Sequence, residues 1–234
     1  MKNKGKCHIM KGVIFMPKRL TLFAGHYGSG KTNIAVNYAI HLKDEGYPVV
    51  IADLDIVNPY FRTKDSEAEL KEKGIELLCS PYAGSNLDIP SLPQEMYRAV
   101  QDKNTYAVMD IGGDDAGAVA LGRFAPFINE EDNFEMIFVV NFFRPLTRTA
   151  EEALTIMREV EAVSHLKFTS IMNNSNLGDD TTAEDIISTQ AELRKLSEIS
   201  GLPVLYTSAK KDIAIALEEK IDNIFPLSLQ NKII

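Results

Sequence analysis

The residues at positions 25–32 carry the clearest chemical signal in the sequence. They read Gly25-His26-Tyr27-Gly28-Ser29-Gly30-Lys31-Thr32 and match the pattern G-x-x-x-x-G-K-[ST] at every fixed position. Glycines let backbone N–H groups approach phosphate oxygens, and a helix starting at the end of this segment favours an anion. Lys31 can reach the β- and γ-phosphates, and the Thr32 hydroxyl is an oxygen ligand suited to Mg²⁺. We predict a phosphate-binding loop, called the P-loop below, rather than a ligand-free glycine turn.

Acidic residues follow two further segments that we expect to be strands. Asp53 and Asp55 end the apolar segment 49–53, and Asp110 ends the segment 106–111. Carboxylates beside a bound phosphate hold Mg²⁺, directly or through water, and orient the attacking water. Asp110 fits the position of a Walker-B aspartate, and the spacing Asp110-Ile111-Gly112-Gly113 lets a glycine N–H turn towards a γ-phosphate. The simpler alternatives are a strand-end cap at Asp110 and a solvated turn at Asp53 and Asp55.

These residues need a scaffold, and the length and pattern of the chain predict one. The chain has 234 residues, of which 45% are hydrophobic. Apolar segments near 20–24, 49–53, 75–79, 106–111, 136–141, 168–173 and 203–206 alternate with helical patterns near 32–45, 63–73, 94–103, 116–128, 147–165, 181–200 and 210–220. Such alternation is typical of an α/β fold. We therefore predict a single three-layer, doubly wound domain over residues 16–234 with a mostly parallel sheet.

The two ends of the chain and the segment 80–93 lie outside that pattern. Met16-Pro17-Lys18-Arg19-Leu20 looks like a natural chain start, so we predict that residues 1–15 are a disordered N-terminal extension. Residues 80–93 are rich in Pro, Ser, Gly and Asn and are expected to form a long loop.

Charge and cysteine content exclude several classes of protein. The chain has 33 acidic and 25 basic residues, a net charge of −8, which disfavours broad nucleic-acid binding. Cys7 and Cys79 lack a C-x-x-C partner and are expected to be plain thiols in a reducing compartment. No apolar run has the length of a membrane span, and the N-terminal segment is too polar for a secretory signal. We predict a cytoplasmic protein.

The P-loop, the D-x-D after the second strand and the D-x-x-G after a later strand resemble the MinD/ParA/CobQ group of P-loop ATPases, of the SIMIBI class, over roughly residues 18–220. The resemblance implies an ATPase that binds ATP or ADP with Mg²⁺. It implies catalytic roles for Lys31, Asp53 and Asp55, and metal-site roles for Thr32, Asp53 and Asp110. The implied nucleotide contacts are the P-loop residues Gly25, His26, Tyr27, Gly28, Ser29, Gly30, Lys31 and Thr32. The resemblance further implies a nucleotide-dependent homodimer and a switch acting on an unidentified protein partner.

The chain departs from that group at His26. Many relatives carry a second lysine there, which reaches across a dimer to the partner's nucleotide. A neutral imidazole does not replace a fixed positive charge, because its unperturbed pKa lies near 6.5. Arg62 or Arg144 could supply the charge instead, although a solvated surface charge is the simpler interpretation of each. We therefore predict weak basal ATPase activity.

The base preference depends on the segment after the strand 168–173. GTP-specific proteins of this fold often read guanine with N-K-x-D, whereas this chain has Asn173-Asn174-Ser175-Asn176. Relatives of the ATP type commonly place an asparagine here, so Asn173 and Asn174 are the implied adenine contacts. Thr207-Ser208-Ala209-Lys210 resembles the S-A-K element of GTPases, which keeps GTP as the alternative.

Other functions are possible on the same fold. The main alternative is a ligase or kinase acting on a small metabolite, as in the CobQ/CobB type, with residues 80–93 and 142–145 forming a substrate pocket. An iron–sulfur carrier would need several thiolate ligands, and the chain has two cysteines. A membrane anchor is not supported, because the tail 221–234 contains Pro226 and few cations. No basic cluster or nucleic-acid-reading motif is visible.

Overall fold

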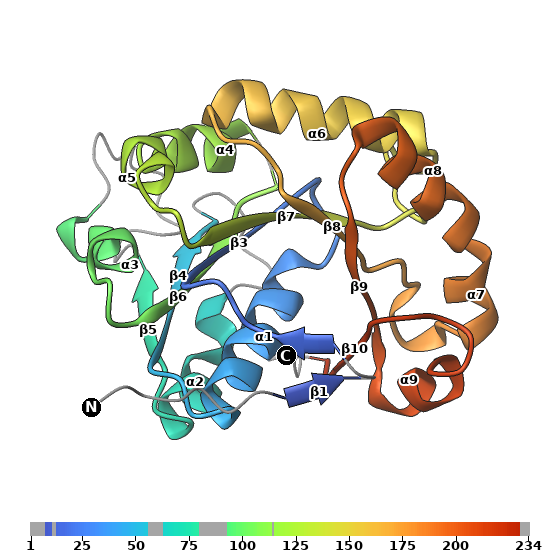
Figure 1. Cartoon of the computed structure of the whole chain (residues 1–234), viewed down its shortest axis with the longest axis horizontal. Coiled ribbons are helices and arrows are strands. Elements are labelled where there is room, and N and C mark those ends of the chain that lie inside the picture. The colour runs from blue at the N-terminus through green and yellow to red at the C-terminus, as the bar shows by residue number, and fades with distance from the viewer. Residues whose placement is uncertain (1–7, 11–12, 56–62, 80–92, 114, 230–234) are drawn as a thin grey trace.

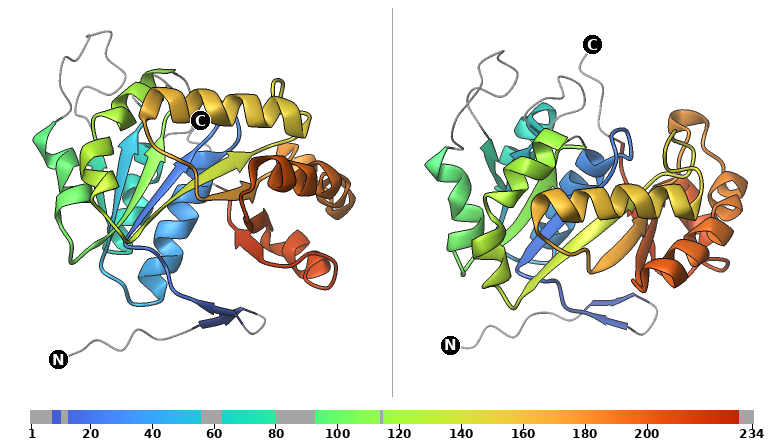
Figure 2. Two further views of the ribbon diagram at one scale, coloured as in Figure 1. Left: turned by 45° about the horizontal axis from the view of Figure 1, so that its top comes forward. Right: turned by 90° about the horizontal axis from the view of Figure 1, so that it is seen from above.

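The computed structural model describes residues 8–10, 13–55, 63–79, 93–113 and 115–229. Across these residues, eight parallel strands form one sheet in the order β10-β9-β8-β7-β3-β6-β4-β5, with helices on both faces (Figures 1 and 2). The strands are β3 (Leu20–Ala24), β4 (Val49–Leu54), β5 (Glu76–Cys79), β6 (Tyr106–Ile111), β7 (Phe134–Val140), β8 (Ser170–Asn173), β9 (Val204–Lys210) and β10 (Ile224–Leu227). The predicted doubly wound α/β fold is confirmed.

Helices cover the sheet in two layers. In Figure 1, α1 (Lys31–Asp44) and α2 (Glu67–Glu72) lie below the sheet, and α4 (Asp115–Gly122), α5 (Ala125–Asn129) and α6 (Ala150–Ser164) lie above it. The other helices are α3 (Arg98–Gln101), α7 (Ala183–Ser188), α8 (Gln190–Ser200) and α9 (Lys211–Leu217), with short 3₁₀ turns at Thr63–Ser66, Gln94–Tyr97 and Gly178–Asp180. Helices α3, α4, α5, α6 and α8 share one buried core, and α1 and α2 share the other.

The central strand β3 contributes to both cores. Leu20, Leu22 and Ala24 belong to the core under α4 and α6, whereas Phe23 packs against α1. All five residues of β3 are buried, as expected for a strand with parallel neighbours on both sides and helices on both faces. Because β3 is buried on both faces, its position in the sheet fixes where the P-loop begins.

Glycines end two helices as predicted. Gly46 has a φ of +90°, and the N–H of Tyr47 donates to the carbonyl of Leu42 at 3.1 Å. Gly74 has a φ of +68°, with the N–H of Ile75 bonded to the carbonyl of Leu70 at 2.8 Å. These bonds satisfy carbonyls that a helix end otherwise leaves open.

The structure differs from the expected elements in several places. The helices expected over 63–73 and 94–103 each begin with a 3₁₀ turn, and β9 continues through residues 207–210, beyond the expected strand end at 206. The helix expected over 116–128 breaks into α4 and α5, with Pro126 in the first turn of α5. The helix expected over 181–200 breaks into α7 and α8, because Thr189 ends α7 and donates its hydroxyl to the carbonyl of Ile186. Strand β10 was not predicted. It pairs with β9 at the sheet edge, where Pro226 is tolerated because no other strand of the described residues pairs with β10 on its outer side.

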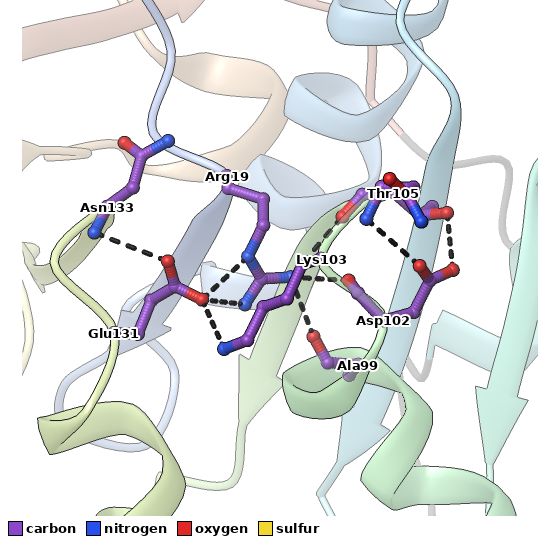
Figure 3. A network of polar contacts seen from close by, with 8 residues as sticks. Arg19, Ala99, Asp102, Lys103, Thr105, Glu131 and Asn133 are labelled. Atoms are coloured by element: carbon purple, nitrogen blue, oxygen red, sulfur yellow. Dashed lines mark hydrogen bonds and ion pairs between the residues drawn. The ribbon is translucent and has the colours of Figure 1, made fainter.

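A buried ion-pair network holds the start of β3, at the end of the strand opposite the P-loop (Figure 3). Nε of Arg19 donates to Oε2 of Glu131 at 2.8 Å, and Nζ of Lys103 lies 2.7 Å from the same oxygen. Nη1 of Arg19 donates to the carbonyls of Ala99 and Asp102, each at 3.1 Å. Arg19 is 5% exposed, so these partners compensate a charge removed from water. The network ties β3 to the segments that follow α3 and α5.

Within the N-terminal segment, residues 8–10 and 13–15 form a two-stranded antiparallel sheet, β1 (His8–Met10) and β2 (Val13–Phe15). Its hydrogen bonds are not continuous with the eight-stranded sheet. Residues 1–7 and 11–12 lie outside the described residues, so disorder of the extension 1–15 and the domain boundary at residue 16 remain predictions.

Candidate nucleotide site

The P-loop lies at the point where the chain winds to opposite faces of the sheet. β3 pairs with β6 on one side and β7 on the other. The helix after β3, α1, covers one face, whereas the helices after β6 and β7, α4 and α6, cover the other (Figure 2). In parallel sheets, ligands bind outside the carboxyl ends of the strands at such a crossing point. The fold therefore places the P-loop where a ligand is expected.

The glycines of the P-loop are required by its backbone and by its neighbours. Gly25, Gly28 and Gly30 have φ values of +152°, +75° and +86°. A Cβ on Gly25 would overlap the carbonyl oxygen of Val139, and a Cβ on Gly30 would overlap the side-chain nitrogen of Asn174. Gly30 also precedes the first residue of α1. The loop is therefore closely packed against the ends of β7 and β8.

The side chain of Lys31 folds back onto the P-loop. Its Nζ donates to the carbonyl oxygen of His26 at 3.1 Å, and the residue is 6% exposed. A Cβ on Gly113 would lie 2.6 Å from that Nζ and 2.7 Å from the backbone nitrogen of Tyr27. The glycine of the D-x-x-G segment thus packs directly on the P-loop.

The three predicted carboxylates gather beside the loop. Asp53 on β4 and Asp110 on β6 are register partners on neighbouring strands, and Asp53, Asp55 and Asp110 are all buried. The backbone N–H of Asp55 donates to Oδ1 of Asp53 at 2.9 Å, which turns the chain at the end of β4. The pairing of β4 with β6 places Asp53 and Asp110 side by side at the carboxyl ends of these strands.

Asp110 is the most perturbed of these groups. Burial raises its pKa to about 6, and Thr32, Lys31 and Thr63 offset part of that effect. The Thr63 hydroxyl donates to Oδ2 at 2.9 Å, whereas Oδ1 is buried without a hydrogen-bond partner among the described residues. A buried carboxylate oxygen of this kind calls for a positive or hydrogen-bonding group. Asp110 and the neighbouring Thr32 hydroxyl therefore offer the oxygen donors that Mg²⁺ takes.

These residues do not form a closed metal cage. Within the described part of the chain, no group of three or more His, Cys, Asp or Glu side chains is arranged to hold a metal ion. Mg²⁺ usually keeps several waters and takes phosphate oxygens in addition to one or two protein ligands.

Asn173 and Asn174 both lie near the loop, but their side chains are engaged within the protein. Nδ2 of Asn173 donates to Thr189 at 3.0 Å, and its Oδ1 accepts from the backbone and hydroxyl of Ser175. Nδ2 of Asn174 donates to the carbonyl of Ser29 at 2.7 Å, and its Oδ1 accepts from the Ser208 hydroxyl at 2.5 Å. Contact with a base remains a prediction for both.

His26 is half-buried beside Lys31. Burial, followed by the Lys31 cation, lowers its pKa below the ordinary 6.5, and Glu159 opposes this only in part. The imidazole is therefore neutral near pH 7. Tyr27, the next residue, is 55% exposed, so its ring is open to solvent at the tip of the loop.

Two functional candidates were missed or undervalued in the sequence. Thr63 lies 47 residues from Asp110, and no motif linked the two. Arg144 is exposed, as expected of a surface charge, and its Nε also donates to the carbonyl of Gly28 at 3.1 Å. Arg62 and residues 80–92, which were weighed as a cation and as part of a substrate pocket, lie outside the described residues.

Comparison with known proteins supports the fold. No family model matches the sequence, and no curated protein sequence matches it. Among solved structures, the cell division protein FtsY of Thermotoga maritima matches with a TM-score of 0.60 at 14% identity, over 88% of this chain and 65% of that one. Chloroplast FtsY of Physcomitrella patens matches with a TM-score of 0.56 at 18% identity, over 88% and 61%. FtsY of Elizabethkingia anophelis in complex with GDP matches with a TM-score of 0.51 at 15% identity, over 88% and 61%.

These matches show a P-loop nucleoside triphosphatase fold. At such low sequence identities, a structural likeness shows the fold alone and not the function. This chain spans less than two thirds of the length of each FtsY structure named above. The narrower resemblance to the MinD/ParA/CobQ group stays a prediction. Among the described residues, no helix has both the length and the apolar character needed to cross a bilayer.

Proposed function

We propose that this chain binds ATP with Mg²⁺ at the P-loop and hydrolyses it slowly, as a nucleotide-dependent switch of the MinD/ParA type. The observation that carries the proposal is the position of Asp110. It is buried, it is paired in register with Asp53, and its Oδ1 has no partner among the described residues. A buried charge of this kind costs stability unless a bound group compensates it.

Each residue of the site has a proposed task. The backbone N–H groups of the P-loop and Lys31 bind the phosphates, which requires Lys31 to exchange its bond to the His26 carbonyl for phosphate oxygens. Thr32 and Asp110, with Asp53, hold the metal and its waters. Asp55 and Asp53 orient the attacking water. When bound, Mg²⁺ neutralises charge on the β- and γ-phosphates.

The base preference follows from what the segment at the end of β8 lacks. Residues 173–176 contain neither the lysine nor the aspartate of N-K-x-D, which favours ATP over GTP. Asn174 links the end of β8 to the P-loop and to Ser208 on β9, which supports a nucleoside site at this corner. The GDP bound to one FtsY structure makes GTP the competitor to test.

Slow turnover follows from His26. The group in the position of the second lysine is a neutral imidazole, whereas transition-state charge on a transferred phosphoryl group is best stabilised by a fixed cation. A nucleotide-dependent homodimer and an unidentified protein partner are part of the proposal, because a slow hydrolase acts as a switch when a partner controls its rate.

Calorimetry and steady-state turnover test this function. ATP and GTP are titrated into the purified chain with and without Mg²⁺, beside Lys31→Ala and the surface control Lys195→Ala on α8. We expect Mg²⁺-dependent binding of ATP in preference to GTP, slow phosphate release, and loss of both in Lys31→Ala alone. No binding of either nucleotide overturns the proposal. A small metabolite that becomes phosphorylated or ligated as ATP is consumed would favour the ligase or kinase alternative.

A further inference from the structure

The turn after β7 brings an arginine onto the tip of the P-loop. Nε of Arg144 donates to the carbonyl oxygen of Gly28 at 3.1 Å. A Cβ on Gly28 would lie 3.5 Å from that Nε, 3.7 Å from Cδ and 3.8 Å from Cζ of Arg144. The guanidinium therefore lies along the middle glycine of the loop, although 116 residues separate the two positions in the chain.

Buried hydrogen bonds hold this turn in one conformation. Oδ1 of Asn141 accepts from the N–H of Phe143 at 3.0 Å, and its backbone carbonyl accepts from the N–H of Arg144 at 3.1 Å. The Thr147 hydroxyl closes the turn by donating to the same carbonyl at 2.8 Å. Asn141 is 0% and Thr147 2% exposed. The backbone position of Arg144 is thus set by the fold, and its exposed side chain extends from this fixed point to Gly28.

Strain in the same turn points to a role beyond connecting two elements. Leu146 has a φ of +65°, a region that costs a residue with a Cβ about 1–3 kcal/mol, and its side chain is 58% exposed. Burial of an apolar side chain therefore does not explain this backbone. Strained positions of this kind cluster at ligand-binding segments, where the surrounding structure maintains them.

The Arg144 guanidinium keeps donors available for an anion beside the P-loop. Arg144 is always charged and presents five N–H donors, of which Nε uses one on Gly28. Within the described part of the chain, Arg144 forms no ion pair with a carboxylate. His26 is neutral near pH 7, because burial and Lys31 lower its pKa. Arg144 is therefore a second fixed cation, besides Lys31, that contacts the P-loop.

Building on the proposed function, we propose that Arg144 contacts the terminal phosphate of the bound nucleoside triphosphate from within the same chain, so that the site favours triphosphate over diphosphate. In hydrolysis, a water oxygen bonds to the γ-phosphorus and the bond from that phosphorus to the β–γ bridging oxygen breaks. The electron pair stays on the diphosphate, and the water proton leaves with inorganic phosphate or solvent. Arg144 binds the phosphoryl oxygens throughout, and its planar fork suits two of them at once.

A purely structural arginine would behave differently. If Arg144 only supported Gly28, its removal would loosen the whole P-loop and weaken diphosphate and triphosphate binding together. If it contacts the terminal phosphate, the loss falls on the triphosphate. The ratio of the two affinities therefore separates these roles.

The test compares Arg144→Ala and Arg144→Lys with wild type and with Arg148→Ala, an exposed arginine four residues along the same segment. Affinities for ATP, ADP, GTP and GDP are measured with Mg²⁺ by calorimetry, together with turnover and the melting temperature without nucleotide. We expect Arg144→Ala to weaken triphosphate binding at least tenfold and diphosphate binding less than threefold, with an unchanged melting temperature. Arg144→Lys should recover part of the loss, and Arg148→Ala should match wild type.

Each other result overturns the proposal in a recognisable way. Equal losses for diphosphate and triphosphate assign Arg144 to support of the loop. Unchanged affinities together with unchanged turnover assign it to the solvated surface. Both results leave the proposed function standing, because the wild-type chain would still bind nucleotide. A wild-type chain that binds none of the four nucleotides overturns the proposed function, and this inference with it.

Discussion

Gly113 packs directly against Lys31: a Cβ at Gly113 would come within 2.6 Å of the Lys31 Nζ. The same Cβ would lie 2.7 Å from both the backbone nitrogen and the Cα of Tyr27. The D-x-x-G segment after β6 therefore touches the P-loop through backbone, where a neighbour cannot yield by rotating a side chain. Movement at Gly113 and movement of the P-loop are coupled by this contact.

Substituting Gly113→Ala should therefore displace the P-loop. Overpacking of this kind costs roughly 1–3 kcal/mol, so we expect nucleotide affinity to fall about 5- to 100-fold and the melting temperature to decrease. Gly122→Ala is the matched control, because its Cβ would meet the Val163 carbonyl oxygen at 3.4 Å, an ordinary contact. Calorimetry and thermal melting check both variants. Wild-type affinity in Gly113→Ala would show that the contact gives way easily.

Asp110→Asn should increase the free energy of unfolding and reduce the Mg²⁺ dependence of nucleotide binding. The buried carboxylate has a pKa raised to about 6 by burial, so its charge is costly near pH 8 in the absence of ligand. We expect the variant to be more stable than wild type by roughly 1–3 kcal/mol in urea unfolding without nucleotide. It should lose most of the Mg²⁺ dependence of triphosphate binding, because the amide is a poorer cation ligand.

The exposed residue Glu198 provides the control for that experiment, as Glu198→Gln removes a charge from α8 without burial. Its unfolding free energy and Mg²⁺ dependence should match wild type. A destabilised Asp110→Asn protein would mean that the charge is already compensated, and would remove the main support for the metal site.

The sequence predicted the P-loop and its carboxylates because each is a local pattern at the end of an apolar strand. In a parallel sheet, such ends meet at one edge, so β4 and β6 brought Asp53 and Asp110 into register without further information. The contacts of Thr63 and Arg144 were beyond this reasoning. Each depends on a tertiary approach, across 47 and 116 residues, and neither residue belongs to a fixed spacing.

The asparagines after β8 show a second limit. Their residue type suggested contact with a base, but residue type does not reveal whether a side chain already has partners. Asn173 is 0% exposed, and its amide group is bonded to Thr189 and Ser175. Thr189 lies between α7 and α8, and Ser175 follows β8 two residues after Asn173. Strand β10 was missed for a related reason. Pro226 argues against a strand in general and is acceptable only at an edge, which the sequence does not mark.

Glu131→Gln should destabilise the protein in a pH-dependent manner. Burial disfavours the Glu131 carboxylate, but hydrogen bonds and charges from Lys103 and Arg19 outweigh it and lower its pKa below the ordinary 4.5. A lowered pKa means that the stabilisation is fully present above pH 4.5 and is lost as the pH falls through the folded-state value. We expect wild type to exceed the variant by roughly 1–3 kcal/mol at pH 7, and the difference to shrink towards pH 3.

The exposed pair of Glu76 and Arg98 is the control for this effect. It has the same chemistry, with bonds of 2.7 Å and 3.0 Å, but both side chains are 51% exposed. Urea unfolding of Glu76→Gln should therefore show a much smaller change at pH 7. Equal changes at the two sites would show that burial of the Arg19 network adds nothing to its strength.

His26→Ala should leave ATP turnover nearly unchanged. Because the His26 pKa is lowered, the imidazole is neutral from pH 7 upwards and contributes no fixed charge there. We expect a change of less than about threefold in turnover at pH 7–8, compared with the 10³–10⁵-fold typical of a lost arginine finger. Fast turnover by the isolated wild-type chain that His26→Ala abolishes would contradict both the neutral imidazole and the proposed slow hydrolysis.

Asn174→Ala tests whether the corner between β8, β9 and the P-loop is prepared before nucleotide binds. Asn174 donates to the Ser29 carbonyl and accepts from Ser208, and its side chain fills the space that a Cβ on Gly30 would occupy. Losing one such bond costs roughly 0.5–1.5 kcal/mol, so triphosphate and diphosphate affinity should both fall about 2- to 10-fold. This equal loss contrasts with the selective loss expected for Arg144→Ala. A loss confined to adenine nucleotides, with guanine nucleotides unaffected, would instead make Asn174 a direct reader of the base.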